Sequence, residues 1–428
     1  MSLELWFIFF LKNMNEEQLK AFELVTQHGK SIFLTGPAGT GKSFTLKKIV
    51  EWFRMSEMRI GVCSSTGTSA VTINGTTLHS FLGIGLAKSS ATHLAFKIRN
   101  RTKVYVKLKA LNALVIDEVS MISDALFDKV SEFLGIVRNR KNLPFGGLQL
   151  ILCGDMCQLP PVDGDYCFKA KAWEALNIEV VNLTIMVRQN GDAEFQKILL
   201  EARYGNISDK SIEKLRSLSN PNFGEVAPTI LFSKNMNVDT INQSEYQKVR
   251  VQGVEERVYP TYFSKHPDTM AWAESLKIPS EVVLCVGSQV MLTVNLNVDE
   301  GFVNGSRGVV SELRDEGVVV VFKDGDQVII QPWTYVYESD EDKDSDKPPE
   351  IFARCIPLKL AYALTIHKSQ SATLDSVVVS LGPSIFEYGQ AYTALSRVRD
   401  MKSIKVVDVL KSSFQTHPDV LEFYKKYS

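Results

Sequence analysis

The sequence has little that points to a membrane. A helix that spans a bilayer needs about 20 consecutive apolar residues, and the apolar run at residues 3–11 is far shorter. That run also lacks the basic leader and the small-residue cleavage site of a secretory signal. We therefore expect residues 1–13 to be an N-terminal extension without a functional role, and we expect no membrane partner.

Cysteine and histidine are scarce, at six each among 428 residues. Cys153 and Cys157 have three residues between them but no histidine pair nearby, which argues against a zinc site. The cysteines stand mostly alone inside apolar runs, as buried and reduced thiols do in intracellular proteins. The chain also shows no internal repeat, and its length predicts about two to four domains.

Charge is balanced over the whole chain but not along it. The net charge is −1, and the composition, 45% hydrophobic and 23% charged, is typical of a globular protein. Residues 58–116, however, contain no aspartate or glutamate. We expect a local positive surface suited to a phosphate backbone, with a solvated charged face as the simpler alternative. The basic residues of this span are Arg59, Lys88, Lys97, Arg99, Arg101, Lys103, Lys107 and Lys109.

The basic residues at positions 97–109 are compatible with two local structures. They fall mostly on odd positions, and a spacing of two would place them on one face of a strand. The apolar residues of the same region instead have a helical spacing, and from sequence alone both alternatives stay open. These apolar residues are Leu94, Ile98, Val104, Leu108 and Leu111.

A glycine-rich segment, SIFLTGPAGTGKSFTLKKIV at residues 31–50, joins a strand pattern to a helix pattern. It matches G-x-x-x-x-G-K-[ST], the P-loop, in which backbone N–H groups and a helix N-terminus surround phosphates. Lys42 is placed to reach the outer phosphates, and the Ser43 hydroxyl is placed to bind Mg²⁺. We predict an ATP site built from Gly36, Pro37, Ala38, Gly39, Thr40, Gly41, Lys42, Ser43 and Phe44.

Two later apolar runs also end in polar residues. ALVIDEVSMI, at residues 113–122, supplies Asp117 to complete the Mg²⁺ site and Glu118 to activate the attacking water. LQLILCGDMCQLPPV, at residues 148–162, supplies Gln158 to sense the terminal phosphate. An isolated Asp-Glu pair is commonly a solvated strand end, but the preceding P-loop favours the catalytic role. The pattern predicts an α/β fold whose parallel sheet binds ligands at the carboxyl ends of its strands.

Four polar residues interrupt an apolar stretch at residues 360–382, LAYALTIHKSQSATLDSVVVSLG. Four consecutive polar side chains are costly to bury without partners, so we expect a catalytic partner, a metal or a long polar ligand here. These residues are His367, Lys368, Ser369 and Gln370. A catalytic triad is disfavoured because no nucleophile elbow accompanies the histidine.

The region before this stretch has a different pattern. Residues 287–296 and 305–336 alternate apolar and polar side chains between glycine-rich turns, and Asp324-Gly325 is a strong hairpin signal. We expect a small β-barrel, followed at residues 338–350 by a solvated acidic loop.

These motifs together resemble those of a known family. GPAGTGKS, SSTGTSAVTINGTTLHSFLGIG, VIDEVSMI, VRQN, IHKSQSATLD and YTALSRVRD are similar, in family order, to the motifs of superfamily-one DNA helicases. Residues 128–155, DKVSEFLGIVRNRKNLPFGGLQLILCGD, resemble the segment typical of the Pif (petite integration frequency) family. The resemblance implies two RecA-like P-loop motor domains with a small SH3-like β-barrel insertion. It also implies ATP-driven 5′-to-3′ translocation on single-stranded DNA with duplex unwinding.

The resemblance implies roles for individual residues. Gln18 is similar to the glutamine that reads adenine, and Arg188 and Arg397 are similar to two arginines that reach the terminal phosphate from the second motor domain. The implied catalytic set is Lys42, Glu118, Gln158, Arg188 and Arg397. The implied DNA contacts, with the basic stretch included, are Thr66, His79, Lys97, Arg99, Arg101, His367, Ser369, Gln370 and Ser371.

Two of the implied DNA contacts, His79 and Ser371, differ from the others. A purely structural role for His79 stays open as an alternative. Ser371 stands where the family normally has glycine, which would allow a close backbone approach or a positive φ. This departure bears on the coupling between DNA contact and hydrolysis rather than on the fold.

The expected domains are a first motor at residues 14–180 with a basic insert near 86–110, a second motor at 181–255 and 359–428, and the barrel at 256–358. We expect a monomeric motor that uses ATP and Mg²⁺ and acts on single-stranded DNA and on tailed or forked duplex DNA. It would work inside the cell with the DNA, in the nucleus or mitochondrion of a eukaryote or in the cytoplasm for a bacterial or viral protein. The alternatives are a nucleotide-gated DNA-binding clamp that hydrolyses ATP poorly and an RNA-directed helicase.

Overall fold

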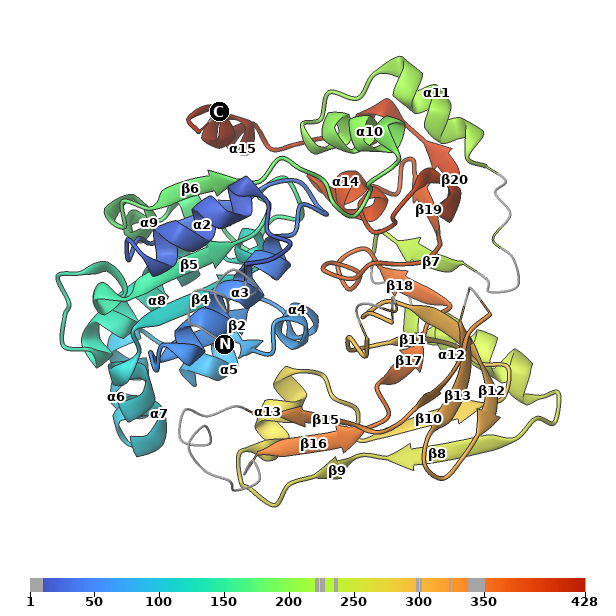
Figure 1. The fold of residues 1–428 in the computed structure, drawn as a ribbon, viewed down its shortest axis with the longest axis horizontal. Helices are drawn as coiled ribbons and strands as arrows, with labels where there is room; N and C mark the ends of the chain where they lie inside the picture. Colours follow the sequence, from blue (N-terminus) through green and yellow to red (C-terminus); the bar gives the residue numbers. More distant parts are fainter. Residues whose placement is uncertain are drawn as a thin grey trace. The chain divides into compact units, whose positions relative to one another are not determined.

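The computed structural model describes residues 11–219, 223, 228–234, 238–297, 300, 302–322, 325–337 and 351–427. The chain forms two units, the first of residues 1–188 with 422–428 and the second of residues 189–421 (Figure 1). Residues 422–428 group with the first unit. The domain boundaries expected from the sequence stay a prediction. Most of the N-terminal extension and the whole acidic loop at 338–350 lie outside the described residues.

The first unit is built on a parallel sheet of six strands in the order β3-β2-β4-β5-β1-β6. Every residue of β1, β2 and β4 is buried, as happens when helices cover both faces of a parallel sheet. This is the predicted α/β arrangement. The strands are β1 (Ile32–Thr35), β2 (Ile60–Ser64), β3 (Thr76–Thr77), β4 (Ala113–Asp117), β5 (Gln149–Cys153) and β6 (Glu179–Asn182).

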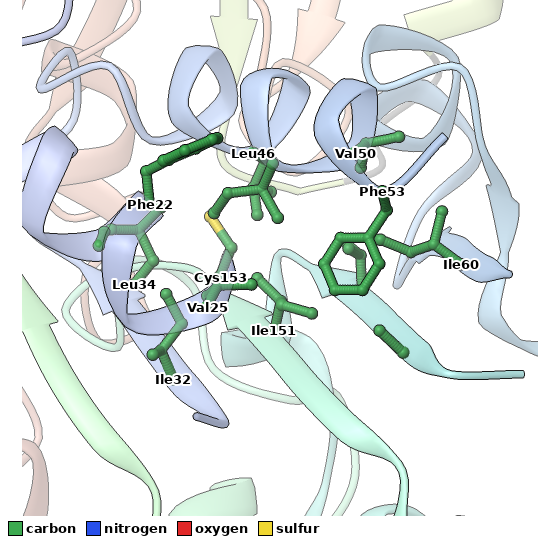
Figure 2. Packing of buried hydrophobic residues seen from close by; sticks show 14 of the residues in the cluster. Phe22, Val25, Ile32, Leu34, Leu46, Val50, Phe53, Ile60, Ile151 and Cys153 are labelled. Carbon is green, nitrogen blue, oxygen red and sulfur yellow. The ribbon is translucent and has the colours of Figure 1, made fainter. Parts of the chain in front are cut away.

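One face of this sheet packs against α2 (Glu16–Thr26) and α3 (Lys42–Met55). Figure 2 shows Leu46 and Phe53 of α3 beside Ile151 and Cys153 of β5, all of them buried. A capping box between Asn15 and Gln18 starts α2, and the left-handed Gly41 precedes α3. The core therefore holds fixed the two helices that flank the glycine-rich loop.

The other face of the sheet packs against aromatic side chains from distant parts of the chain. The Phe33 ring of β1 lies with its centroid 5.3 Å from Trp173 of α9 (Lys171–Ala175) and 6.0 Å from Phe423 of α15 (Pro418–Lys425). Successive residues of a strand point to opposite faces, so Phe33 and its neighbour Leu34 enter different cores. The remaining helices of this unit are α4 (Gly67–Thr72), α5 (Leu78–Leu82), α6 (Ala91–Arg99), α7 (Thr102–Ala110) and α8 (Asp124–Val137).

The basic stretch at 97–109 is helical, so the strand interpretation is wrong. Ile98 of α6 and Leu108 of α7 are buried, while Lys97 and Arg99 are exposed. Arg101, at φ −103° and ψ 77°, breaks the stretch into two short helices. Lys97 and Arg99 lie in the last turn of α6, and Lys107 and Lys109 lie in the last turn of α7.

Arg138, in the segment similar to the Pif family, anchors the end of α7. Its guanidinium donates to the backbone oxygens of Leu108, Lys109 and Leu111, at 2.9–3.2 Å, and to that of Gly146 at 3.0 Å. These carbonyls at the end of a helix have no partner within the helix. The segment similar to the Pif family thus stabilises the C-terminal end of the basic helix α7.

The second unit contains a parallel sheet of four strands in the order β18-β7-β19-β20. Its strands are β7 (Thr229–Phe232), β18 (Ala363–Thr365), β19 (Val377–Leu381) and β20 (Ile404–Val409). The helices of this unit are α10 (Ala193–Arg203), α11 (Asp209–Ser217), α12 (Val238–Arg250), α13 (Thr269–Ser275) and α14 (Gln390–Leu395).

Three antiparallel sheets occupy the region predicted to be a barrel, in the orders β14-β13-β12-β11-β17, β15-β16-β9 and β10-β8. The expected pairing of 318–322 with 327–330 is present, and Gly325 has a φ of 88°. Closure into an SH3-like barrel stays a prediction. The strands are β8 (Glu256–Pro260), β9 (Tyr262–Phe263), β10 (Glu281–Cys285), β11 (Gln289–Leu292), β12 (Arg307–Leu313), β13 (Val318–Phe322), β14 (Gln327–Ile330), β15 (Trp333–Val336), β16 (Phe352–Cys355) and β17 (Leu358–Leu360).

Candidate functional site

The P-loop joins β1 to α3 as the sequence predicts, and it needs its glycines. Gly36 has a φ of 140°, and a Cβ there would lie 2.2 Å from the backbone oxygen of Leu183. Gly41 has a φ of 86°, and its Cβ would lie 2.4 Å from Nε2 of Gln18. No other residue fits these positions without a shift of backbone or side chain. The loop therefore keeps the phosphate-binding form that its motif indicates.

Lys42, the first residue of α3, folds back over the loop. Its Nζ donates to the backbone oxygens of Gly36 at 2.8 Å and of Pro37 at 2.9 Å. The ammonium thus lies over the concave side of the P-loop, where it suits phosphate oxygens. Ser43 follows in the first turn and is half-buried, while Phe44 is exposed.

Gln18 is held by the protein at both ends of its amide. Oε1 accepts the backbone N–H of Asn15 at 3.1 Å, and Nε2 donates to the backbone oxygen of Thr40 at 3.2 Å. The residue is buried. Gln18 thus connects α2 to the P-loop by a hydrogen bond. Its contact with adenine stays a prediction.

Asp117 and Glu118 lie at the carboxyl end of β4, at the same edge of the sheet as the P-loop. Burial, with a smaller contribution from the Glu118 carboxylate, raises the pKa of Asp117 to about 7. The Cys153 thiol, the Glu118 amide and the Lys42 ammonium act in the opposite direction. A buried carboxylate that resists ionisation is suited to a cation, which stabilises its charged form.

Glu118 has a left-handed backbone, with φ 51° and ψ 45°. Such a conformation costs a non-glycine residue roughly 1–3 kcal/mol and is found preferentially at functional sites. Hydrogen bonds from both sides of the residue help to hold this conformation. The Ser65 hydroxyl donates to the Glu118 carbonyl at 2.9 Å, and the Glu118 amide donates to Oδ1 of Asp117 at 2.9 Å.

Gln158 and Arg188 are also close to the P-loop in the fold. Gln158 is buried in the turn after β5, and its backbone N–H donates to the backbone oxygen of Asp155 at 3.0 Å. The amides of Val187 and Arg188 donate to the Gly39 carbonyl at 2.8 and 3.1 Å. The first unit therefore brings Lys42, Asp117, Glu118, Gln158 and Arg188 to one edge of its sheet.

The loop that carries Thr66 follows β2 beside Glu118. Thr66 caps α4, and its hydroxyl lies 2.6 Å from that of Ser69. Ser65, which holds the Glu118 carbonyl, precedes it directly. Ser65 is a functional candidate that was not predicted, although its hydroxyl stands next to the predicted DNA contact Thr66 in the sequence. His79 in α5 is half-buried, and burial lowers its pKa.

The polar stretch in the second unit forms a tight turn after β18. His367 is half-buried, and burial lowers its pKa. Ser369 and Gln370 are buried, and the Ser369 hydroxyl donates to the backbone oxygen of Ile366 at 2.8 Å. Half of the predicted contacts here thus have buried side chains, and their DNA binding stays a prediction.

Arg397 is buried behind this turn rather than exposed. Its guanidinium donates to the Thr393 carbonyl at 2.9 Å, to the Ser396 hydroxyl at 2.8 Å and to the Ser369 carbonyl at 3.3 Å. The predicted phosphate-sensing arginine and the predicted DNA-binding turn are therefore directly bonded within the second unit. Contact of Arg397 with a phosphate stays a prediction.

Ser371 adopts the left-handed conformation expected of a glycine at this position, with a φ of 67°. Serine replaces the glycine typical of the family at a position that favours glycine. The side chain is half-buried.

Other kinds of site find no support in the described ranges. No group of three or more histidine, cysteine or acidic side chains there has a geometry that could hold a metal ion. All six cysteines are buried. Over the same ranges, no helix is long and apolar enough to cross a membrane.

Comparison with known proteins places these features in a family. A family model described as PIF1-like helicase matches residues 13–213, and one described as the 2B domain of DNA helicase Pif1 matches residues 275–313. The ATP-dependent DNA helicase PIF1 of Homo sapiens is 36% identical over 428 residues, covering 96% of this chain and 63% of the human protein. This chain thus spans less than two thirds of the human protein's length.

A bacterial relative and a solved structure match over nearly their whole lengths. The ATP-dependent DNA helicase Pif1 of Bdellovibrio bacteriovorus is 32% identical over 422 residues, covering 97% of this chain and 92% of that protein. The crystal structure of Pif1 helicase from Candida albicans has a TM-score of 0.76 and 32% identity, covering 97% of this chain and 99% of the other. The resemblance seen in the motifs is confirmed, and the chain belongs to the PIF1-like helicase family.

Proposed function

We propose that this chain is an ATP-dependent DNA helicase that moves 5′ to 3′ on single-stranded DNA and unwinds tailed or forked duplexes. The observation that carries the proposal is the placement of Lys42, Asp117 and Glu118 at the carboxyl edge of one parallel sheet, around a P-loop that only glycine permits. Membership of the helicase family supports DNA as the substrate.

The residues of the first unit fit ATP and Mg²⁺. The P-loop amides and Lys42 would bind the phosphates, and Ser43 and Asp117 would hold the metal ion together with phosphate oxygens. Bound Mg²⁺ supplies positive charge beside the oxygens that become more negative during phosphoryl transfer. Glu118 is the proposed base for the attacking water, with Gln158, Arg188 and Arg397 as proposed ligands of the terminal phosphate.

The link between DNA and hydrolysis is proposed to run through backbone contacts. In the first unit, the Ser65 hydroxyl joins the loop of Thr66 to the Glu118 carbonyl at 2.9 Å. In the second unit, Arg397 joins the turn of Ser369 at 3.3 Å. A DNA strand bound at either loop would therefore shift Glu118 or Arg397, which are proposed to act on ATP. The exposed Lys97, Arg99 and Arg101 would add contacts with phosphates that do not depend on base sequence.

The test is the ATPase rate with and without single-stranded DNA, beside unwinding of duplexes with 5′ or 3′ tails. We expect strong stimulation by DNA and unwinding of the 5′-tailed substrate only. Lys42→Ala should abolish both activities, whereas Lys48→Ala, on the same helix in a partly exposed pair with Glu51, should leave both unchanged. Binding of DNA without unwinding would indicate the clamp, and selective stimulation by RNA would indicate the RNA-directed enzyme.

A further inference from the structure

The C-terminal helix α15 places an aromatic cluster on the first unit. The Phe423 ring stacks on Phe168 with a centroid distance of 4.5 Å and lies 6.0 Å from both Phe33 and Trp173. Both Phe423 and its neighbour Tyr424 are buried. Aromatic burial of this size fixes the position of the helix end on the sheet. Tyr424 is therefore held in place by packing that does not involve its own hydroxyl.

The Tyr424 hydroxyl lies in a buried polar network at the carboxyl ends of β1 and β5. Its Oη is 2.6 Å from Oγ1 of Thr35, the last residue of β1. It accepts the Met156 amide at 3.1 Å and donates to Oδ1 of Asp155 at 3.4 Å. Because the phenol has one proton, donation to Asp155 leaves Thr35 as the donor to Oη. One hydroxyl thus joins two neighbouring strand ends.

Both strand ends lead directly into the proposed catalytic groups. Thr35 precedes Gly36, the first residue of the P-loop motif. Asp155 starts the turn that contains Gln158, and the backbone oxygen of Asp155 accepts the backbone N–H of Gln158 at 3.0 Å. The Asp155 carboxylate also accepts the Cys157 amide at 3.1 Å. The Tyr424 hydroxyl therefore links the start of the Gln158 turn to the residue that precedes the P-loop.

We propose that Tyr424 is a positioning residue for ATP hydrolysis, which sets the distance between the P-loop and the Gln158 turn through Thr35, Asp155 and Met156. The proposal rests on the proposed function, because it assigns Tyr424 a part in that reaction. Tyr424 lies outside both residue ranges matched by the family models. It acts through its neighbours and touches neither ATP nor the attacking water.

The test is Tyr424→Phe, which keeps the ring and removes only the hydroxyl. A displaced catalytic group costs rate rather than ground-state binding, so we expect kcat of the DNA-stimulated ATPase to fall about ten-fold. KM for ATP should change less than about two-fold, because the P-loop and Lys42 remain. Tyr427→Phe is the matched control, since it removes the same atom from an exposed tyrosine three residues later. It should behave as wild type.

A double-mutant cycle separates positioning from general loss of structure. Thr35→Val removes the other end of the 2.6 Å contact. If both residues act through one network, the double variant should lose little more kcat than either single variant. The melting temperature of each variant is measured in parallel. Phe423→Ala, which removes packing but leaves the hydroxyl, reports the effect of a loosened α15 on stability.

Each outcome of these measurements either supports the proposal or overturns it. A fall in kcat with KM and melting temperature preserved, together with a coupled cycle, supports the proposal. Wild-type kcat in Tyr424→Phe overturns it. It is also overturned if kcat falls only in proportion to melting temperature and recovers on cooling, because the role is then structural. An inactive wild-type chain would overturn the proposed function and, with it, the role of Tyr424, so the two failures are distinguishable.

Discussion

Each unit has a left-handed residue other than glycine in a loop that follows a strand of its parallel sheet. In the first unit it is Glu118, directly after β4, with a φ of 51°. In the second it is Ser371, in the turn after β18, with a φ of 67°. Both loops carry proposed functional groups, as expected for backbone strain held by its surroundings.

The two positions differ in what the side chain is required to do. At 118 a carboxylate is needed as the proposed base, so glycine cannot replace it, and the Ser65 and Asp117 contacts offset the strain. At 371 the resemblance implies glycine, so the fold does not require a side chain there, and serine adds backbone strain. The backbone strain at Glu118 therefore follows from the need for a carboxylate base, whereas the strain at Ser371 can be removed by glycine.

The largest effect is expected at the first of these positions. Glu118→Gln keeps the size and the backbone of the residue but removes the base. General base catalysis contributes roughly 100-fold to 10,000-fold, so ATP turnover should fall by at least about 100-fold while ATP still binds. The measurement is single-turnover hydrolysis beside equilibrium binding of a fluorescent ATP analogue. Hydrolysis at the wild-type rate would show that Glu118 is not the base.

The first unit was largely predictable because its signals are contiguous. Gly36, Lys42, Asp117 and Glu118 lie in short motifs whose local geometry depends on a few neighbouring residues. The strand-loop-helix order and the parallel sheet follow from the same local patterns.

Other features depend on contacts that no local pattern reveals. Thr35 and Tyr424 are 389 residues apart in sequence, so the contribution of α15 to the first unit was not visible. The sequence left strand and helix open at 97–109, because the basic residues have a spacing of two and the apolar residues a helical spacing, and the break at Arg101 was not predicted. The burial of Arg397 behind the Ser369 turn is likewise set by tertiary packing.

The next largest effect concerns the exposed basic residues of the first unit. The triple variant Lys97→Gln, Arg99→Gln and Arg101→Gln should weaken DNA binding equally for different base sequences. Each lost phosphate contact should lower the slope of log affinity against log salt by about one unit. Binding is measured at several salt concentrations, with the exposed Lys171→Gln as a control. An unchanged slope would mean that these side chains form only a solvated surface.

A smaller effect is expected from a charge in the second loop. Ser371→Asp places a carboxylate where we expect a DNA phosphate, and like charges repel. The DNA concentration for half-maximal ATPase stimulation should rise about ten-fold, which corresponds to about 1.4 kcal/mol. The basal ATPase rate, measured without DNA, should change much less, because no DNA phosphate is then present to be repelled. A DNA titration that matches wild type would show that position 371 does not touch the strand.

The smallest effect is a test of strain itself. Ser371→Gly relieves a left-handed conformation worth about 1–2 kcal/mol but adds about 0.5–1 kcal/mol of backbone entropy to the unfolded chain. The free energy of unfolding should therefore rise by about 0.5–1 kcal/mol. Ser217→Gly is the control, because Ser217, the last residue of α11, is not among the residues with a positive φ, so glycine there relieves no strain and should not stabilise the chain.

The matching change in the first unit, Glu118→Gly, completes the comparison. It should also relieve strain and stabilise the fold, but it removes the proposed base, so stability and activity should move in opposite directions. At 371 the two should not conflict: Ser371→Gly should gain stability while DNA-stimulated ATPase changes only a few-fold. Both are measured by urea unfolding and by ATPase titration with DNA. If Ser371→Gly instead destabilises the chain, the serine makes a contact worth more than its strain, and the left-handed turn at 371 is as constrained as the one at 118.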